Sequence, residues 1–266
     1  MGYYVGIDVG STTSKAVVID EKGEIVSSSI VRNSHNLTES GRKAFLSALG
    51  KEEIITQNQV KYVVSTGYGR RIIDFHNEAE PEVICHGVGT MKIVPTCRTI
   101  IDIGGQDSKV IGLDEKGIKK FQMNDKCAAG TGRYLDKLAN DILGIKVEQL
   151  GEYSLKSRKP LSISSQCTVF AETEIISFLS NRELIEDIIA GMHNSLAKRV
   201  IQMGRAANIK FETDIVFSGG VAKNVGIVKA IEMLLGEEVI VPQEPQLTAA
   251  LGAALMAKDR FKGGVL

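Results

Sequence analysis

Neither charge predominates in this 266-residue sequence, which has 32 Lys and Arg against 32 Asp and Glu. A dedicated nucleic-acid-binding protein normally has a basic excess, so we expect no nucleic-acid partner. No apolar run approaches the ~20 residues that span a bilayer, and no basic segment precedes Asp8. We therefore expect no signal peptide, no membrane partner and a cytoplasmic location.

Cysteine is scarce, and no two cysteines form a CxxC pair. The four are Cys85, Cys97, Cys127 and Cys167. The missing CxxC excludes the common zinc-ribbon and thioredoxin patterns, and disulfides are not expected in a cytoplasmic chain. Cys85, in an apolar helical segment, and Cys97, beside a strand, are expected in the core.

The common nucleotide-binding fingerprints are also missing. The sequence has no Walker A motif, and Gly130-Thr131-Gly132 is followed by Leu135 where GxGxxG requires a third glycine. A nucleotide site, if present, must be built in another way.

The sequence does contain an internal repeat. When residues 5–23 are aligned with residues 99–117, nine of 19 positions are identical, whereas chance gives roughly one. Each copy reads as an apolar strand with an Asp near its end, a glycine turn, a second apolar strand and a charged turn. This pattern predicts two β-hairpins and two related halves.

Helical periodicity follows each hairpin, and one more short strand is expected. The expected helices lie at 38–50, 83–93, 135–143, 184–200, about 221–235 and 247–257, and the strand at 214–217. Alanine and glycine on one face of the last helix predict close packing. We expect one half at 1–95, completed by the terminal helix 246–258, and a second at 96–245.

Three turns share one arrangement, in which an apolar strand stops at glycines and polar side chains follow. They begin at Asp8, Asp102 and Phe217. Glycine lets backbone N–H groups approach an anion, hydroxyls and lysine add donors, and a carboxylate at a strand end suits Mg²⁺ held through water. Any one of them is more simply a structural turn, but three together favour a nucleotide site.

These turns resemble the phosphate-1, phosphate-2 and adenosine motifs of the acetate kinase/sugar kinase/Hsp70/actin superfamily. The resemblance implies an α/β fold of two ribonuclease-H-like halves, with mixed sheets and helices on both faces. It implies that Asp8 and Asp102 organise Mg²⁺, and that Gln106 or Asp107 orients the attacking water. The residues implied to bind ATP or ADP are Ser11, Thr12, Thr13, Ser14, Lys15, Gly104, Gly105, Gly219, Gly220, Lys223 and Gln243.

Cys127 and Cys167 have related contexts, because each precedes a predicted helix. We expect both thiols at helix N-termini, where the helix dipole favours a thiolate or a negatively charged cluster. Two cysteines cannot complete a four-iron site, but a twofold dimer supplies four.

The segments NDKCAAGTGR, SSQCTVFAE, DIGGQD, TGYGR and SGGVAKN are similar to those of the BadF/BadG/BcrA/BcrD ATPase family. That resemblance implies an ATPase that activates a 2-hydroxyacyl-CoA dehydratase of the 2-hydroxyisocaproyl-CoA or 2-hydroxyglutaryl-CoA type. It implies a homodimer whose subunits share one [4Fe-4S] cluster through Cys127 and Cys167. It also implies ferredoxin or flavodoxin as electron donor.

Two other functions use the same turns. A small-molecule kinase of the N-acetylhexosamine or pantothenate type would contain no iron, and Asp102 would be its base. An actin-like or chaperone-like scaffold would use nucleotide only as a switch, but no filament-forming or peptide-binding insertion is visible.

Overall fold

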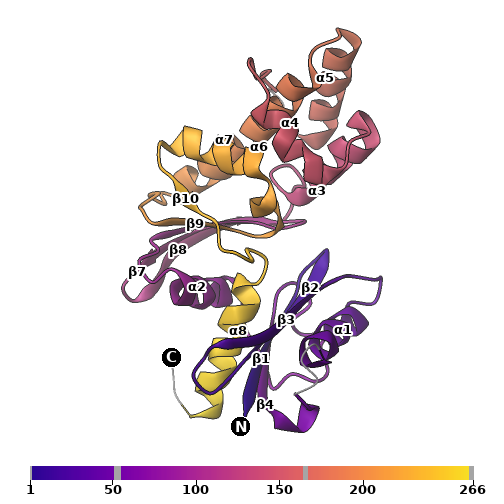
Figure 1. Cartoon of the computed structure of the whole chain (residues 1–266). Coiled ribbons are helices and arrows are strands. Elements are labelled where there is room, and N and C mark those ends of the chain that lie inside the picture. Colours follow the sequence, from indigo (N-terminus) through magenta and orange to yellow (C-terminus); the bar gives the residue numbers. More distant parts are fainter. Residues whose placement is uncertain (1, 51–54, 164–166, 264–266) are drawn as a thin grey trace. The chain divides into compact units, whose positions relative to one another are not determined.

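The computed structural model describes residues 2–50, 55–163 and 167–263, and the chain divides into two compact units (Figure 1). Unit 1 comprises Met1–Cys97, Glu115–Ile118 and Gln246–Leu266, and unit 2 comprises Arg98–Asp114 and Lys119–Pro245.

Unit 1 is built on a mixed five-stranded sheet in the order β3-β2-β1-β4-β5. The strands are β1 (Tyr3–Val9), β2 (Thr13–Ile19), β3 (Ile25–Arg32), β4 (Val60–Thr66) and β5 (Glu78–Ala79). β1 runs antiparallel to β2 and parallel to β4. Every residue of β1 is buried, as expected for a central strand with both faces covered.

Helices cover both faces of this sheet. α1 (Leu37–Gly50) and α8 (Thr248–Phe261) pack against its strands, α2 (Glu82–Ile93) packs against α8, and η1 (Gln57–Gln59) is a short helical turn before β4. Val5 and Ile7 of β1 share a core with Phe45 of α1, whereas Tyr4 belongs to the core of α8. A Cβ on Gly6 would lie 1.9 Å from the Ala250 carbonyl oxygen, so this glycine permits the expected close packing of α8.

Unit 2 repeats the strand plan of unit 1. Its sheet has the order β10-β9-β6-β7-β8, formed by β6 (Thr99–Ile103), β7 (Ser108–Asp114), β8 (Gly117–Asn124), β9 (Ile215–Ser218) and β10 (Val239–Ile240). The β6–β7 pair is antiparallel and β6–β9 is parallel, as for β1–β2 and β1–β4. The predicted hairpin repeat is therefore confirmed.

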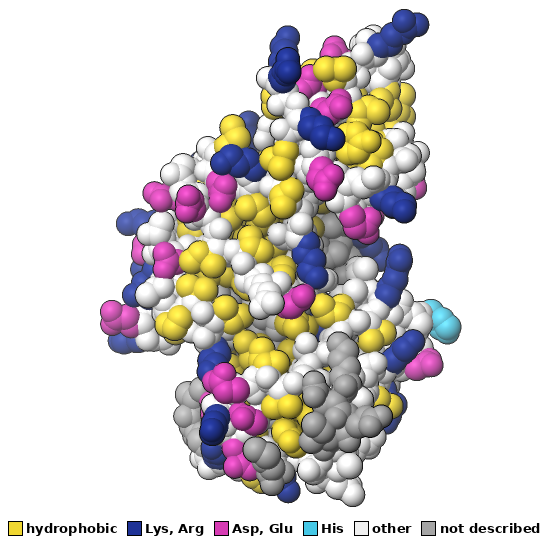
Figure 2. Space-filling model, in the orientation of Figure 1, with side chains coloured by type: hydrophobic (Ala, Val, Ile, Leu, Met, Phe, Trp, Pro, Cys, Tyr) yellow, Lys and Arg dark blue, Asp and Glu magenta, His cyan; other side chains and the backbone are white. Residues whose placement is uncertain are grey.

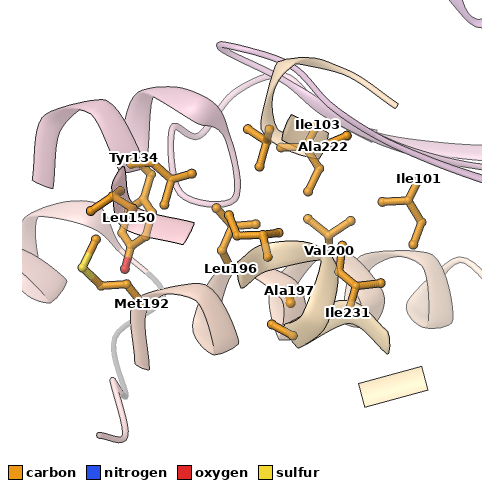
Figure 3. Close-up of a cluster of buried hydrophobic side chains, with 14 of the residues drawn as sticks. Ile101, Ile103, Tyr134, Leu150, Met192, Leu196, Ala197, Val200, Ala222 and Ile231 are labelled. Atoms are coloured by element: carbon orange, nitrogen blue, oxygen red, sulfur yellow. The ribbon is translucent and has the colours of Figure 1, made fainter. Parts of the chain in front are cut away.

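The helical part of unit 2 packs around one long amphipathic helix, α6. The helical elements are α3 (Gly132–Lys137), η2 (Leu138–Leu143), η3 (Val147–Gln149), α4 (Leu150–Leu155), α5 (Thr168–Ser180), α6 (Ile185–Ala206), η4 (Gly220–Lys223) and α7 (Val225–Leu235). Figure 3 shows Leu196 and Val200 of α6 within the cluster that also contains Leu150 and Ile231. The helical stripes read from the sequence point into this core.

Among the described residues, no helix is both long enough and apolar enough to cross a membrane.

Candidate functional site

The first turn connects β1 to β2 and carries a buried ion pair. Asp8 lies opposite Lys15 in the antiparallel register, and Lys15 Nζ donates to Asp8 Oδ2 at 2.8 Å. The turn closes through Gly10 N–H donating to the Thr13 carbonyl at 3.1 Å. The repeated Asp and Lys thus form one pair because the hairpin places them face to face.

The other oxygen of Asp8 is the most informative atom of this turn. Asp8 is 3% exposed, and its Oδ1 has no hydrogen-bond partner among the residues that the structure describes. Burial raises the pKa of Asp8, although Lys15 opposes the shift. A buried bare carboxylate oxygen is costly unless a ligand completes it, and Mg²⁺ prefers oxygen ligands and retains waters. The residues present therefore fit the cation implied by the sequence.

Gly67 keeps space beside that oxygen. It follows β4, whose Thr66 pairs with Asp8, and has φ +86°. A Cβ at Gly67 would lie 2.3 Å from Asp8 Oδ1. The TGYGR segment thus begins at the Asp8 carboxylate, a position that its residue pattern does not reveal.

The hydroxyl residues of the first turn differ in availability. Ser11 and Thr13 are half-buried and Thr12 is exposed. Ser14 is buried, and its Oγ donates to Asn33 Oδ1 at 2.7 Å. Asn33 Nδ2 in turn donates to the Gly10 carbonyl at 2.8 Å. Ser14 is therefore engaged in bracing the turn through Asn33, a residue that the sequence pattern did not single out.

The second turn connects β6 to β7 and holds a larger charge network. Lys109 Nζ lies 3.3 Å from Asp102 Oδ2 and also contacts Asp107. The Lys109 side chain is 1% exposed. Asp102 Oδ1 accepts from Ser218 Oγ at 2.9 Å, so both oxygens of Asp102 have protein partners.

The loop between Asp102 and Lys109 is tied to the start of α3. Gly132 N–H donates to the Gly104 carbonyl at 2.8 Å, and Arg133 N–H to the Gly105 carbonyl at 2.9 Å. The Gln106 amide oxygen, in the orientation its neighbours require, accepts from the Arg133 guanidinium. Arg133 was not among the predicted site residues.

The third turn follows β9 and is braced from two sides. Gly219 has φ +88°, and its N–H donates to the Pro245 carbonyl at 2.9 Å. Gly220 opens η4, and Lys223 at its end lies 3.2 Å from Glu244, both side chains being about half exposed. Gln243 is also exposed.

A buried histidine supports the segment after this turn. Asn224 caps α7 by accepting from Gly226 N and Ile227 N, and its amide nitrogen lies 3.3 Å from His193 Nε2. Burial lowers the pKa of His193 to about 3, so the ring is neutral near pH 7. A histidine on the buried face of a helix is the only sign of this contact in the sequence pattern.

The four cysteines fall into two classes. Cys85 and Cys97 are 0% and 1% exposed, as expected, and burial raises the pKa of the Cys85 thiol to about 12. Cys127 is partly exposed and Cys167 exposed. Only the second class offers thiols that solvent or a ligand can reach.

The expected placement at helix N-termini is correct for one of these two thiols. Cys167 occupies the N-cap position of α5. Cys127 does not, because α3 has Thr131 at its N-cap position, four residues later. Asn124 holds the intervening loop away from helical geometry: its side chain accepts from Cys127 N–H at 3.2 Å and donates to the Cys127 and Ala129 carbonyls.

Known proteins are similar to this chain over nearly its whole length. The model of the BadF/BadG/BcrA/BcrD ATPase family matches residues 5–257. The chain belongs to this ATPase family. It is 46% identical to the 2-hydroxyisocaproyl-CoA dehydratase activator of Clostridioides difficile, covering 98% of this chain and 96% of that protein.

Solved structures agree with this family assignment. The (R)-2-hydroxyglutaryl-CoA dehydratase component A of Acidaminococcus fermentans is 42% identical, with a TM-score of 0.94 and coverage of 98% and 100%. The Clostridium difficile activator with bound ADPNP is 45% identical, with a TM-score of 0.92 and coverage of 98% and 96%. A Streptomyces griseus ROK-family glucokinase, 16% identical with a TM-score of 0.56 over 97% and 100% of the two chains, shares the fold alone. The predicted fold class of this ATPase is confirmed.

Proposed function

We propose that this ATPase activates a 2-hydroxyacyl-CoA dehydratase, of the 2-hydroxyisocaproyl-CoA or 2-hydroxyglutaryl-CoA type, by driving one electron to it. One observation carries the proposal: the chain is 46% identical to a protein named as a 2-hydroxyisocaproyl-CoA dehydratase activator. Its accessible thiols, Cys127 and Cys167, and its glycine turns suit the cluster and the nucleotide that the proposal requires.

The turns supply the nucleotide chemistry of the proposal. Asp8 would hold Mg²⁺ through water, using the oxygen that Lys15 leaves bare. Ser11, Thr12 and Thr13 donate to the β- and γ-phosphates, together with Lys15 once nucleotide competes for its ammonium. The remaining contacts come from unit 2, with Asp102 organising the second turn. They are Gly104, Gly105 and Gln106 for the phosphates, and Gly219, Gly220, Lys223 and Gln243 for adenosine.

Cys127 and Cys167 would hold a [4Fe-4S] cluster, with two thiolates from each subunit of a homodimer. Such a cluster, when bound, supplies one-electron transfer at low potential. The donor set fits this group, because thiolates are its normal ligands and the other two cysteines are sealed in the core.

The surface around Cys167 supports a partner subunit. Val169, Phe170 and Ile176 of α5 are 64%, 66% and 48% exposed, and Figure 2 shows hydrophobic side chains gathered at the α5 end of the molecule. A concentration of exposed apolar side chains commonly marks an interface. A twofold axis near Cys167 at this surface would bring the two copies of that cysteine together.

ATP enters the proposal through linkage. A nucleotide shifts a redox or conformational equilibrium only by the difference in its affinity for the two states. Ferredoxin or flavodoxin would reduce the dimer, and hydrolysis would change the arrangement of α3 and α5 so that the dehydratase receives the electron.

The first test is iron and acid-labile sulfide measured on protein purified without oxygen. We expect about four of each per dimer, with loss of iron in Cys127→Ser and Cys167→Ser and retained ADP binding in both. Cys97→Ala is the matched control and should keep its iron. Iron-free wild-type protein would contradict the proposal and favour the small-molecule kinase, to be tested by a screen of hydroxyl substrates.

A further inference from the structure

The loop that carries Cys127 and the second phosphate turn are joined by hydrogen bonds. Gly132 and Arg133, the first residues of α3, donate their N–H groups to the carbonyls of Gly104 and Gly105. A Cβ on Gly132 would lie 3.1 Å from the Gly104 carbonyl oxygen. The start of α3 therefore rests directly on the backbone of the turn.

Hydrogen bonds also connect the start of α3 to Cys127. Thr131 Oγ1 donates to the Ala128 carbonyl at 2.6 Å, and the Asn124 side chain bonds to both backbone groups of Cys127. From Asn124 to Arg133 the chain is one hydrogen-bonded segment. A displacement of the α3 start would thus reach Cys127 without crossing a flexible link.

Gln106 is the polar side chain through which nucleotide would act on this segment. Its amide oxygen accepts from Arg133 Nη1 at 2.5 Å and Nε at 3.1 Å, and from Nη2 as well. A carbonyl oxygen has two lone pairs, so Arg133 occupies the acceptor capacity of Gln106. An attacking water can be oriented by this oxygen only after Arg133 has withdrawn.

We propose that Arg133 is a positioning residue that competes with the attacking water for Gln106 and passes the outcome to Cys127. This inference rests on the proposed function, because it assumes hydrolysis near Gln106 and a cluster at Cys127. In one state Gln106 binds Arg133 and hydrolysis is restrained. In the other Gln106 orients water, Arg133 is released, and the first turn of α3 moves with the Cys127 loop.

The test compares wild-type protein with Arg133→Ala, Arg133→Lys and Arg205→Ala, all prepared without oxygen. Arg205 is an exposed arginine of α6 that contributes nothing to the turns. Two quantities are measured: the turnover rate of MgATP without dehydratase, and the rate of iron removal by a chelator with MgADP and with MgADPNP.

Loss of Arg133 should uncouple ATP turnover from the rate of iron removal. We expect Arg133→Ala to hydrolyse ATP roughly tenfold faster than wild type, which is the effect of losing about one charge-assisted hydrogen bond. We also expect the chelator to remove iron from this variant at the same rate with MgADP as with MgADPNP. Arg133→Lys, which keeps a charged donor, should restore part of both properties. Arg205→Ala should behave as wild type. In Gln106→Ala protein, adding Arg133→Ala should change nothing, because the shared partner is gone.

Contrary outcomes separate the inference from the proposed function. Two results for Arg133→Ala would overturn the role of Arg133 and leave the proposed function intact. They are slower hydrolysis with an unchanged KM, and a nucleotide effect on iron removal equal to that of wild type. Wild-type protein without iron, or with iron removal indifferent to nucleotide, would instead overturn the proposed function.

Discussion

Asp8 in unit 1 and Asp102 in unit 2 occupy the same place in the hairpin repeat, and each lies opposite a lysine across its hairpin. Their second oxygens differ. Asp102 Oδ1 accepts from the hydroxyl of Ser218, whereas Asp8 Oδ1 has no partner in the described part of the chain. One carboxylate is satisfied by protein on both oxygens, and the other keeps one bare oxygen among the described residues.

The difference arises on the neighbouring parallel strand. Thr66 and Ser218 are equivalent, because they pair with Asp8 and Asp102 respectively. Ser218 donates to its Asp, but Thr66 Oγ1 donates to the Glu80 carbonyl at 2.9 Å. A single change of hydroxyl partner thus separates a turn whose carboxylate keeps a bare oxygen from one whose carboxylate is fully hydrogen-bonded. The two copies share the hairpin and differ in the hydrogen bonds that surround the carboxylate.

The largest expected effect is on hydrolysis. Asp8→Asn removes the charge that would hold hydrated Mg²⁺, so we expect the rate of phosphate release from MgATP to fall by about 100-fold or more. The iron content should remain at the wild-type level. Full activity in Asp8→Asn would show that the bare oxygen is not the cation ligand.

The equivalent change in unit 2 should act on stability. Asp102→Asn leaves Lys109, with its side chain 1% exposed, with Asp107 as its remaining carboxylate partner. Weakening a buried ion pair in this way costs about 3 kcal/mol, which urea unfolding would detect. If Asp8→Asn destabilised the protein equally, the two carboxylates would not differ as the structure indicates.

Gly67 allows the cation site to be tested with a matched glycine. Gly67 and Gly23 both have φ +86°, so alanine adds similar backbone strain at each. The Gly67 methyl group would meet Asp8 Oδ1 at 2.3 Å and the Val9 carbonyl oxygen at 2.7 Å, both within the first turn, whereas that of Gly23 would meet the flexible end of the Lys258 side chain at 3.0 Å. We expect Mg²⁺-dependent ADP binding, measured by calorimetry, to weaken roughly tenfold to a hundredfold in Gly67→Ala only.

Acidification should lower the free energy of unfolding through His193, a buried residue of unit 2. Burial lowers the pKa of His193 to about 3, whereas histidine in an unfolded chain titrates near 6.5. The unfolded state therefore binds more protons below pH ~6.5, so the stability is fully present above that pH and declines toward pH 3. The free energy of unfolding should fall by about 2 kcal/mol between pH 7 and 5 from this group. His193→Gln should have a flatter pH profile, and an equally steep one would exclude His193 as the cause.

The smallest expected effect comes from removing the hydroxyl donor of Asp102, so that its Oδ1 loses this partner and resembles Asp8 Oδ1. Ser218→Ala leaves Asp102 Oδ1 without its hydroxyl donor, which should lower the free energy of unfolding by about 1 kcal/mol. Because Lys109 still binds the other oxygen, hydrolysis should change little. A large loss of activity would mean that Asp102 contributes directly to the cation site.

Much of the fold could be predicted because its signals are local. The hairpin repeat, the helical stripes and the burial of Cys85 and Cys97 all follow from residues close together in the sequence. The expected placement of Cys127 at a helix N-terminus was wrong because Asn124 side-chain bonds, which periodicity does not reveal, hold Cys127 in a loop that precedes α3.

The sequence by itself determined which residues form the turns and which aspartates and lysines face each other, since a hairpin fixes its own register. Only the tertiary structure decided that Asp8 keeps a bare oxygen beside Gly67, and that Ser218 completes Asp102. Those partners arrive on parallel strands far along the chain. The hydrogen bond that satisfies a buried carboxylate depends on which side chain the fold brings within about 3 Å, and no local pattern specifies that.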